Sequence, residues 1–216
     1  MAGGSLTLLD GQRFDVVIIG GGINGASSAQ HLAAAGYSVL LADKGDFGSG
    51  STSRASRLLH CGLRFFETPR PLLDFTLAPG KLAVALRMAK SSMEMRGEIA
   101  KDSPERLRKF KMLFPILKDG PYTGWQLDLA IKLLGRYGPR DVPLDYQRLD
   151  AHAGAALPFI GQLDAGQLAS VGSYTEYMFD WPERLCIDAV LDAERMGAVV
   201  CNHTHATLGE RNEGVW

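Results

Sequence analysis

The sequence predicts an α/β protein that starts with a parallel βαβ unit. An apolar run fills residues 15–19, as a buried parallel strand requires. Three glycines and an alanine-rich stretch at 24–35 follow, and Gly36 is suited to end this helix. A second apolar run at 38–42 then ends on Asp43. A strand, a glycine-rich turn, a helix and a second strand in this order indicate a Rossmann-like fold.

The rest of the chain is expected to alternate helices and short strands. Prolines between 69 and 80 mark the change of character. The expected elements are a charged helix over 81–112, a short strand at 114–117, a helix at 125–137, a connecting loop from 139 to 166, a strand at 174–179, a helix at 182–196 and a strand at 198–201. Asp180 is expected to cap the helix at 182–196, whose buried face would hold Leu185, Ala189, Ala193 and Met196.

Composition excludes several classes of protein. The chain is 46% apolar and 22% charged with a net charge of −1, so nothing in its charge favours nucleic acid as a partner. Its three cysteines form no CxxC pair, which argues for a reducing compartment and against a metal site. There is no apolar run long enough to span a bilayer and no signal peptide pattern. We expect a cytoplasmic protein, with peripheral contact at the inner face of the cytoplasmic membrane left open.

The glycine loop Gly20-x-Gly22-x-x-Gly25 indicates a dinucleotide site because of its context. Gly20 allows the tight turn, Gly22 lets the backbone approach a pyrophosphate, and Gly25 lets the helix pack against the strand. The helix start supplies free N–H groups to the anion. Asp43 lies 18 residues after Gly25, near the spacing of about 20 for a carboxylate that binds an adenosine ribose. A carboxylate there disfavours NADP, and the alternative is a strand–turn–helix loop without a ligand.

The segment at 49–67 combines hydroxyls, arginines and a histidine directly after the second strand. Such groups suit phosphate oxygens. Two stretches, Gly20-Gly21-Gly22-Ile23-Asn24-Gly25-Ala26 and Ser51-Thr52-Ser53 with Ser56 to Glu67, carry a specific likeness. With them the chain resembles the FAD-dependent glycerol-3-phosphate dehydrogenase family, within the D-amino-acid-oxidase-like flavoproteins. It departs from that pattern at Arg57, where the family has Lys, and at Cys61, where the family has Gly.

The resemblance implies which residues hold FAD. Gly20, Gly22, Gly25 and Asp43 would hold the ADP half. The phosphates or the ribityl chain would contact hydroxyls of the next segment. The full expected set is Gly20, Gly22, Ile23, Asn24, Gly25, Asp43, Lys44, Thr52, Ser53 and Ser56.

The resemblance also implies a substrate pocket. Arg64 would bind an anionic substrate and His60 would lie near the isoalloxazine ring. The alternatives are structural pairing of His60 and Arg57 in the loop, and a buried partner for Arg64. The catalytic base is expected beyond Trp216, with His60 as a candidate within this chain. No metal is expected, because His203 and His205 are not accompanied by carboxylate or cysteine residues that could complete a metal site.

The domain organisation follows from the same resemblance. We expect a flexible tail at 1–13, the first part of the FAD-binding domain at 14–70, an inserted α+β substrate or cap region at 71–166, and an incomplete return to the FAD-binding domain at 167–216. The chain would then be an amino-terminal fragment, truncated at its C-terminus, that alone binds FAD weakly and turns over little substrate.

The implied activity is the oxidation of sn-glycerol 3-phosphate to dihydroxyacetone phosphate, with electrons passed to a quinone. Two alternatives stay open, an amine or amino-acid oxidase of the same superfamily and a non-catalytic FAD-binding module. Glu94, Glu98, Asp102 and Glu105 are interpreted as a solvated helix face rather than paired catalytic carboxylates. The helix at 125–137 is interpreted as core packing, with a membrane interface as the alternative.

Overall fold

The computed structural model describes residues 9–164 and 166–210. The outer ends of the expected segments 1–13 and 167–216, namely residues 1–8 and 211–216, lie outside this range. The chain forms two compact units, one made of residues up to Arg57 together with those from Trp181 onward, and one made of Leu58–Asp180. The functional domain boundaries expected at 70 and 166 stay a prediction.

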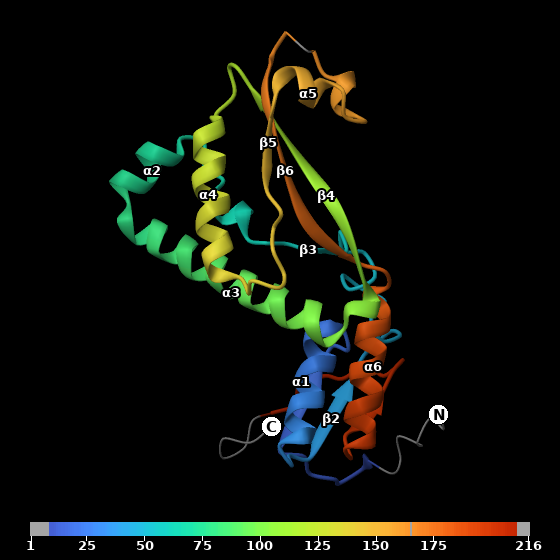
Figure 1. The fold of residues 1–216 in the computed structure, drawn as a ribbon. Coiled ribbons are helices and arrows are strands. Elements are labelled where there is room, and N and C mark those ends of the chain that lie inside the picture. Colours follow the sequence, from blue (N-terminus) through green and yellow to red (C-terminus); the bar gives the residue numbers. More distant parts are fainter. Residues whose placement is uncertain (1–8, 165, 211–216) are drawn as a thin grey trace. The chain divides into compact units, whose positions relative to one another are not determined.

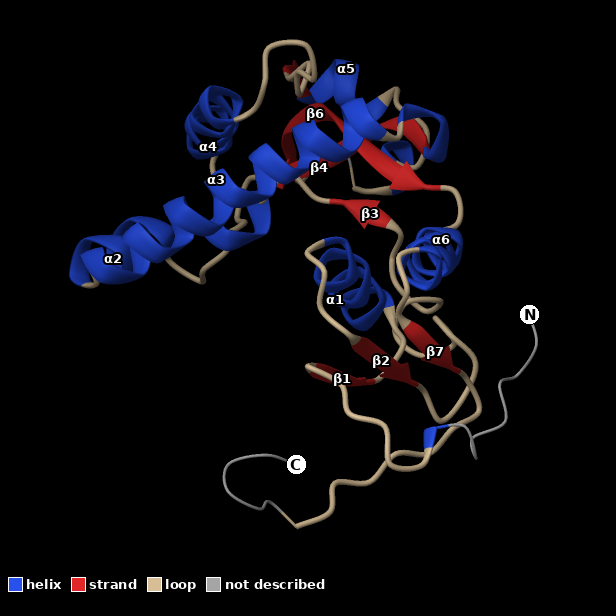
Figure 2. Cartoon of the chain, turned by 90° about the horizontal axis from the view of Figure 1, so that it is seen from below, coloured by secondary structure: helices blue, strands red, loops and turns tan. Residues whose placement is uncertain are grey.

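The first unit contains a three-stranded parallel sheet with two helices on one face. Strands β1 (Val16–Ile19), β2 (Val39–Ala42) and β7 (Val199–Cys201) lie in the order β1-β2-β7. Helices α1 (Ile23–Ala34) and α6 (Pro182–Arg195) lie side by side over that face (Figures 1 and 2). The expected parallel βαβ unit is confirmed.

Small side chains let α1 and α6 approach closely. Ala26, Ala29 and Ala33 of α1 pack in one cluster with the buried residues of α6. On α6 these are Cys186, Ala189, Val190 and Ala193. The expected buried face of α6 was therefore right for Ala189 and Ala193 and wrong for two residues, since Leu185 is only partly buried and Met196 is exposed. Spacing i, i+3, i+4, i+7 from Cys186 defines the face that meets α1.

The start of α6 also differs from the expectation. Its N-cap residue is Trp181, and no side chain caps the helix. Asp180 instead forms an ion pair with Arg108. Pro182 still occupies the first turn, where its missing N–H costs nothing.

The second unit is an antiparallel sheet packed against helices. Its central strand β6 (Leu168–Phe179) pairs with β3 (Leu58–Leu59), β4 (Leu107–Leu117) and β5 (Gln147–Asp150). The helices are α2 (Pro71–Leu77), α3 (Pro79–Asp102), α4 (Gly124–Tyr137) and α5 (Ala151–Ala155), with short 3₁₀ turns at Leu63–Phe66, Pro104–Arg106 and Ile160–Gln162. Figure 1 shows β4 and β6 running alongside each other.

Two expectations for this unit were wrong. The helix expected over 81–112 ends at Asp102, and residues 107–112 begin the strand β4. The connecting loop expected from 139 to 166 contains β5 and α5, and Asp150 caps α5 by accepting a hydrogen bond from the Ala153 N–H. Residues 107–112 and β5 are extended because they pair with β6, a contact between distant parts of the chain.

The charged face of α3 agrees with its interpretation, whereas α4 packs in the core on one face and leaves Trp125 and Leu129 exposed. Glu94, Glu98 and Asp102 on α3, together with Glu105 beyond it, are all exposed. Helix α4 buries Leu127, Ile131 and Leu134 in the core and begins with a capping box between Thr123 and Gln126. Within the described residues, no helix is both long and apolar enough to cross a membrane.

Candidate functional site

The glycine loop between β1 and α1 is shaped by close backbone contacts. Gly20 has φ of +109°, a conformation that favours glycine, and its N–H donates to the Ala42 carbonyl at 2.8 Å. A Cβ on Gly25 would lie 1.9 Å from the Gly20 carbonyl oxygen. The loop therefore needs glycine at both positions so that α1 can start directly against the turn.

The start of α1 offers free hydrogen-bond donors. The Ile23 N–H donates to Thr52 Oγ1 at 3.0 Å, and the Ala26 N–H donates to the Gly22 carbonyl at 2.9 Å. Across residues 9–164 and 166–210, no acceptor faces the N–H groups of Gly22, Asn24 and Gly25. A cradle of glycines with unpaired N–H groups at a helix start fits a pyrophosphate. The expected residues Gly20, Gly22, Ile23, Asn24 and Gly25 thus meet in one place.

Asp43, which follows β2, contacts this loop. Its Oδ2 accepts the Gly21 N–H at 2.6 Å and its Oδ1 accepts the Gly45 N–H at 2.7 Å. Asp43 therefore holds the glycine loop in shape. A carboxylate has about four acceptor positions, so two are left for a ligand. The ribose contact expected for Asp43 stays a prediction.

The Gly21 peptide is anchored by residues that sequence patterns did not single out. Its carbonyl accepts the Gly48 N–H at 2.9 Å and the Cys186 thiol at 3.3 Å. Burial, then the negative charge of Asp43, raises the pKa of Cys186 to about 11. The thiol is therefore protonated and donates near neutral pH. Only tertiary packing of α6 against the loop makes Cys186 part of this site.

The remaining expected cofactor residues surround the loop. Thr52 is buried, whereas Ser56 and Lys44 are exposed. The Ser53 hydroxyl donates to the carbonyls of Ser49 and Gly50 at 3.1 and 3.0 Å, so it stabilises its own turn. The cofactor contacts of Ser53, Ser56 and Lys44 stay predictions.

Thr52 should stabilise the start of α1 even without a ligand. Thr52→Val removes the acceptor of the Ile23 N–H and keeps the side-chain size, so the free energy of unfolding should fall by about 1 kcal/mol. Urea denaturation without cofactor measures the change. Thr52→Ser keeps the hydroxyl and serves as the control. Equal stability of Thr52→Val and the wild type would show that the hydroxyl does not stabilise the helix.

The second unit contains a cavity of about 210 Å³ beside the predicted substrate residues. It lies between the segment that follows β3 and one face of the β4–β6 pair. Met112 and Tyr174 face each other across the two strands, and Glu176 follows Tyr174 on the same face. The lining residues are His60, Cys61, Leu63, Arg64, Glu67, Met112, Leu113, Phe114, Tyr174 and Glu176.

Arg64 and His60, which the resemblance assigns to the substrate pocket, both line this cavity, and their roles stay predictions. Both side chains are exposed, and neither has a hydrogen bond or an ion pair within the described part of the chain. The described residues thus contain no buried partner for Arg64, contrary to that alternative. An unpaired guanidinium at a cavity is suited to a bidentate contact with phosphate or carboxylate.

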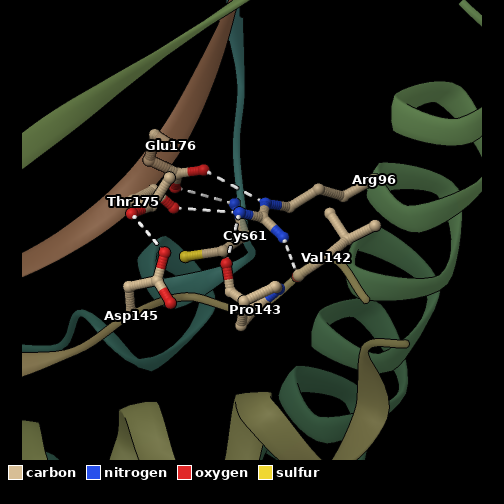
Figure 3. A network of polar contacts seen from close by, with 7 residues as sticks. All are labelled: Cys61, Arg96, Val142, Pro143, Asp145, Thr175 and Glu176. Atoms are coloured by element: carbon tan, nitrogen blue, oxygen red, sulfur yellow. Dashed lines mark hydrogen bonds and ion pairs between the residues drawn. The ribbon is translucent and has the colours of Figure 1, made fainter. Parts of the chain in front are cut away.

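A buried ion pair supports the cavity wall. Figure 3 shows Arg96 of α3 beside Glu176 of β6, with Arg96 Nε 3.6 Å from Glu176 Oε2. The two side chains are 0% and 1% exposed. Arg96 also donates to the carbonyls of Val142 at 2.8 Å and Thr175 at 2.9 Å. Glu176 Oε1 accepts the Cys61 N–H at 2.9 Å, so this pair fixes the segment that carries Arg64.

The Cys61-Gly62 step explains how that segment turns. Cys61 is buried, and its pKa is raised by burial, then by Glu176, so the thiol is neutral. The side chain that replaces the family's glycine therefore packs in the core cluster. Gly62 has φ of +91°, and a Cβ there would lie 3.0 Å from Ala89 Cα. Glycine is required at the second position because α3 approaches so closely.

Known protein families and structures show which family has this sequence and fold. A family model described as FAD dependent oxidoreductase matches residues 15–216. The chain belongs to this family. The expected Rossmann-like FAD-binding fold and the expected cofactor class are confirmed by it. The sequence singles out the glycine loop, Arg64 and His60, and it does not single out Arg96, Tyr174 and Glu176, which lie at or beside the same cavity and have no local motif.

Several relatives of this family are similar to the chain. The aerobic glycerol-3-phosphate dehydrogenase of Staphylococcus saprophyticus is 31% identical over 91% of this chain and 32% of its own length. The aerobic glycerol-3-phosphate dehydrogenase of Staphylococcus haemolyticus is 28% identical over 92% of this chain and 32% of its own length. The chain thus spans about a third of the length of these relatives.

Solved structures show the same fold. The glycerol-3-phosphate dehydrogenase of Bacillus halodurans, complexed with FAD, has a TM-score of 0.59 at 21% identity, covering 96% of this chain and 30% of that one. The L-proline dehydrogenase of P. horikoshii has a TM-score of 0.61 at 18% identity, covering 94% and 47%. Such a likeness carries the fold and not the substrate.

No metal centre is apparent within residues 9–164 and 166–210. These residues contain no group of three or more His, Cys, Asp and Glu side chains that could hold an ion. His203 and His205 follow β7 rather than lying on a strand.

Proposed function

We propose that the chain takes part in the FAD-dependent oxidation of sn-glycerol 3-phosphate to dihydroxyacetone phosphate, with a quinone as the electron acceptor. The proposal is carried by the Arg64 guanidinium, which lines a small cavity and has no partner among the described residues. The glycerol-3-phosphate dehydrogenases similar to the chain support the same substrate class. Cytoplasmic location, with peripheral contact at the inner face of the cytoplasmic membrane, belongs to the same proposal.

The chain's own residues would bind and orient the reactants. The unpaired N–H groups of Gly22, Asn24 and Gly25 would hold the cofactor pyrophosphate, with Asp43 near the ribose. Bound FAD supplies the acceptor for the hydride that leaves C2 of the substrate. Arg64 would bind the substrate phosphate, and His60 is the candidate acceptor of the hydroxyl proton.

Substitution of Arg64 tests this proposal. Arg64→Met should weaken binding of glycerol 3-phosphate about 10- to 100-fold, because a charge-assisted contact is lost. Arg64→Lys keeps the charge without the planar fork, so its affinity for glycerol 3-phosphate should lie between those of the wild type and Arg64→Met. Isothermal titration calorimetry of the FAD-supplemented chain measures the affinity.

Arg70→Met is the matched control, since Arg70 is an exposed arginine that lies outside the cavity lining. It should bind glycerol 3-phosphate as the wild type does. Equal affinity of Arg64→Met and the wild type would refute the phosphate contact. Tighter binding of proline or glycine than of glycerol 3-phosphate would instead favour an amino-acid substrate.

A further inference from the structure

Tyr174 is a nearly buried residue in the wall of the cavity next to Arg64 and His60. It lies in the middle of β6, opposite Met112 on β4, and only 6% of it is exposed. Its ring packs in the core cluster with Leu63 and Ile116. The strand pairing and the packing hold this side chain in one place, so its position is fixed before any ligand arrives.

The Tyr174 hydroxyl has no hydrogen-bond partner in the part of the chain that the structure describes. Among residues 9–164 and 166–210, no group donates to it or accepts from it. Arg96 Nε and Glu176 Oε2, which face each other, are buried from solvent and have no hydrogen bond. The Tyr174 hydroxyl is not among such buried atoms. The hydroxyl therefore opens on accessible space, and the space that Tyr174 lines is the cavity.

The surroundings keep this hydroxyl protonated. Burial raises the pKa of Tyr174 above its ordinary value, and the negative charges of Glu176 and Glu67 raise it further. Tyr174 is therefore a neutral donor at physiological pH and not a base. A donor that opens on a cavity and has no partner among the described residues can donate to an acceptor that a ligand supplies.

We propose that Tyr174 is a substrate-binding residue that donates a hydrogen bond to a hydroxyl oxygen of a small phosphorylated polyol. This inference rests on the proposed function. Arg64 provides the positive charge for the phosphate, whereas a neutral donor suits an uncharged hydroxyl oxygen. Glu176 connects Tyr174 with the segment that carries Arg64. It lies two residues after Tyr174 on β6, and it accepts the N–H of Cys61 on that segment.

The substitution Tyr174→Phe removes the hydroxyl and keeps the ring. We expect it to weaken binding of glycerol 3-phosphate about tenfold, and to leave binding of inorganic phosphate unchanged. The midpoint of urea unfolding should not fall, because no protein hydrogen bond is lost. Titration calorimetry with both ligands and urea denaturation of the 216-residue chain measure these effects.

Tyr146→Phe is the matched control. The Tyr146 hydroxyl donates to Asp128 Oδ1 at 2.6 Å, so its loss should lower the unfolding midpoint and leave both affinities unchanged. A Tyr174→Phe variant that behaves like this control, or that weakens both ligands equally, would overturn the inference.

Failure of the inference and failure of the proposed function are distinguishable. If the wild type binds glycerol 3-phosphate and Tyr174→Phe binds it with the same affinity, only the role of Tyr174 is overturned. Absence of glycerol 3-phosphate binding by the wild type overturns the proposed function and this inference with it.

Discussion

The Arg96→Met variant is expected to lose about 3–5 kcal/mol of its free energy of unfolding, because it leaves a buried charge unpaired. Glu176 is 1% exposed, and in that variant its partners among the described residues are the N–H and the thiol of Cys61. The carbonyls of Val142 and Thr175 lose their donor as well. Guanidinium chloride denaturation of the purified variant measures the loss.

A matched control lies on the same helix. Lys90 and Glu94 of α3 form an exposed i,i+4 pair at 3.7 Å. Lys90→Met should therefore cost less than about 1 kcal/mol. If Arg96→Met were no more destabilising than Lys90→Met, the buried pair would not be the element that joins α3 to β6.

A double-mutant cycle separates the pair from its surroundings. Glu176→Gln removes the charge and keeps an acceptor for the Cys61 N–H. Arg96→Met combined with Glu176→Gln should cost less than the sum of the single changes, since the double variant leaves no unpaired charge. Additive losses would show that the two side chains act independently.

Gly25→Ala is expected to destabilise the first unit by about 1–3 kcal/mol and to weaken FAD binding. The added methyl group would lie 1.9 Å from the Gly20 oxygen and 3.1 Å from the Gly20 carbonyl carbon. Both are backbone atoms, so no side chain can move aside, and the start of α1 must shift. That shift would displace the N–H groups expected to hold the pyrophosphate.

Gly50→Ala tests whether the effect belongs to this position. Gly50 lies in the same unit with an ordinary φ, and a Cβ there meets nothing within 4 Å. Its substitution should change the free energy of unfolding by less than about 1 kcal/mol. Thermal unfolding and titration of flavin fluorescence compare the variants. A Gly25→Ala variant with wild-type stability and wild-type FAD affinity would contradict the packing argument.

In the second unit, the local sequence pattern predicts the wrong secondary structure for residues 107–112. Residues 107–112 have a charged pattern that resembles the end of α3, yet they pair with β6 over Phe179 to Tyr174. Pro115 is tolerated in β4 because this strand lies at an edge of the sheet described here. Pairing between distant segments overrides local propensity, so the helix expected there stops at Asp102.

The sequence by itself determined the βαβ unit and its glycine loop. That information is local, since the strand and the helix are encoded by short apolar or alanine-rich runs and the turn between them by Gly20 and Gly25. The resemblance in 49–67 likewise identified Arg64 and His60 before their cavity was known.

Only the tertiary structure decided how that cavity is built. Tyr174 and Glu176 line this cavity because β6 pairs with β4. The charge of Glu176 is balanced by Arg96, which lies on a helix far away in the sequence. The role of Cys186 at the glycine loop depends on the packing of α6 against α1. Burial and charge compensation arise only when distant segments meet, so no local pattern predicts them.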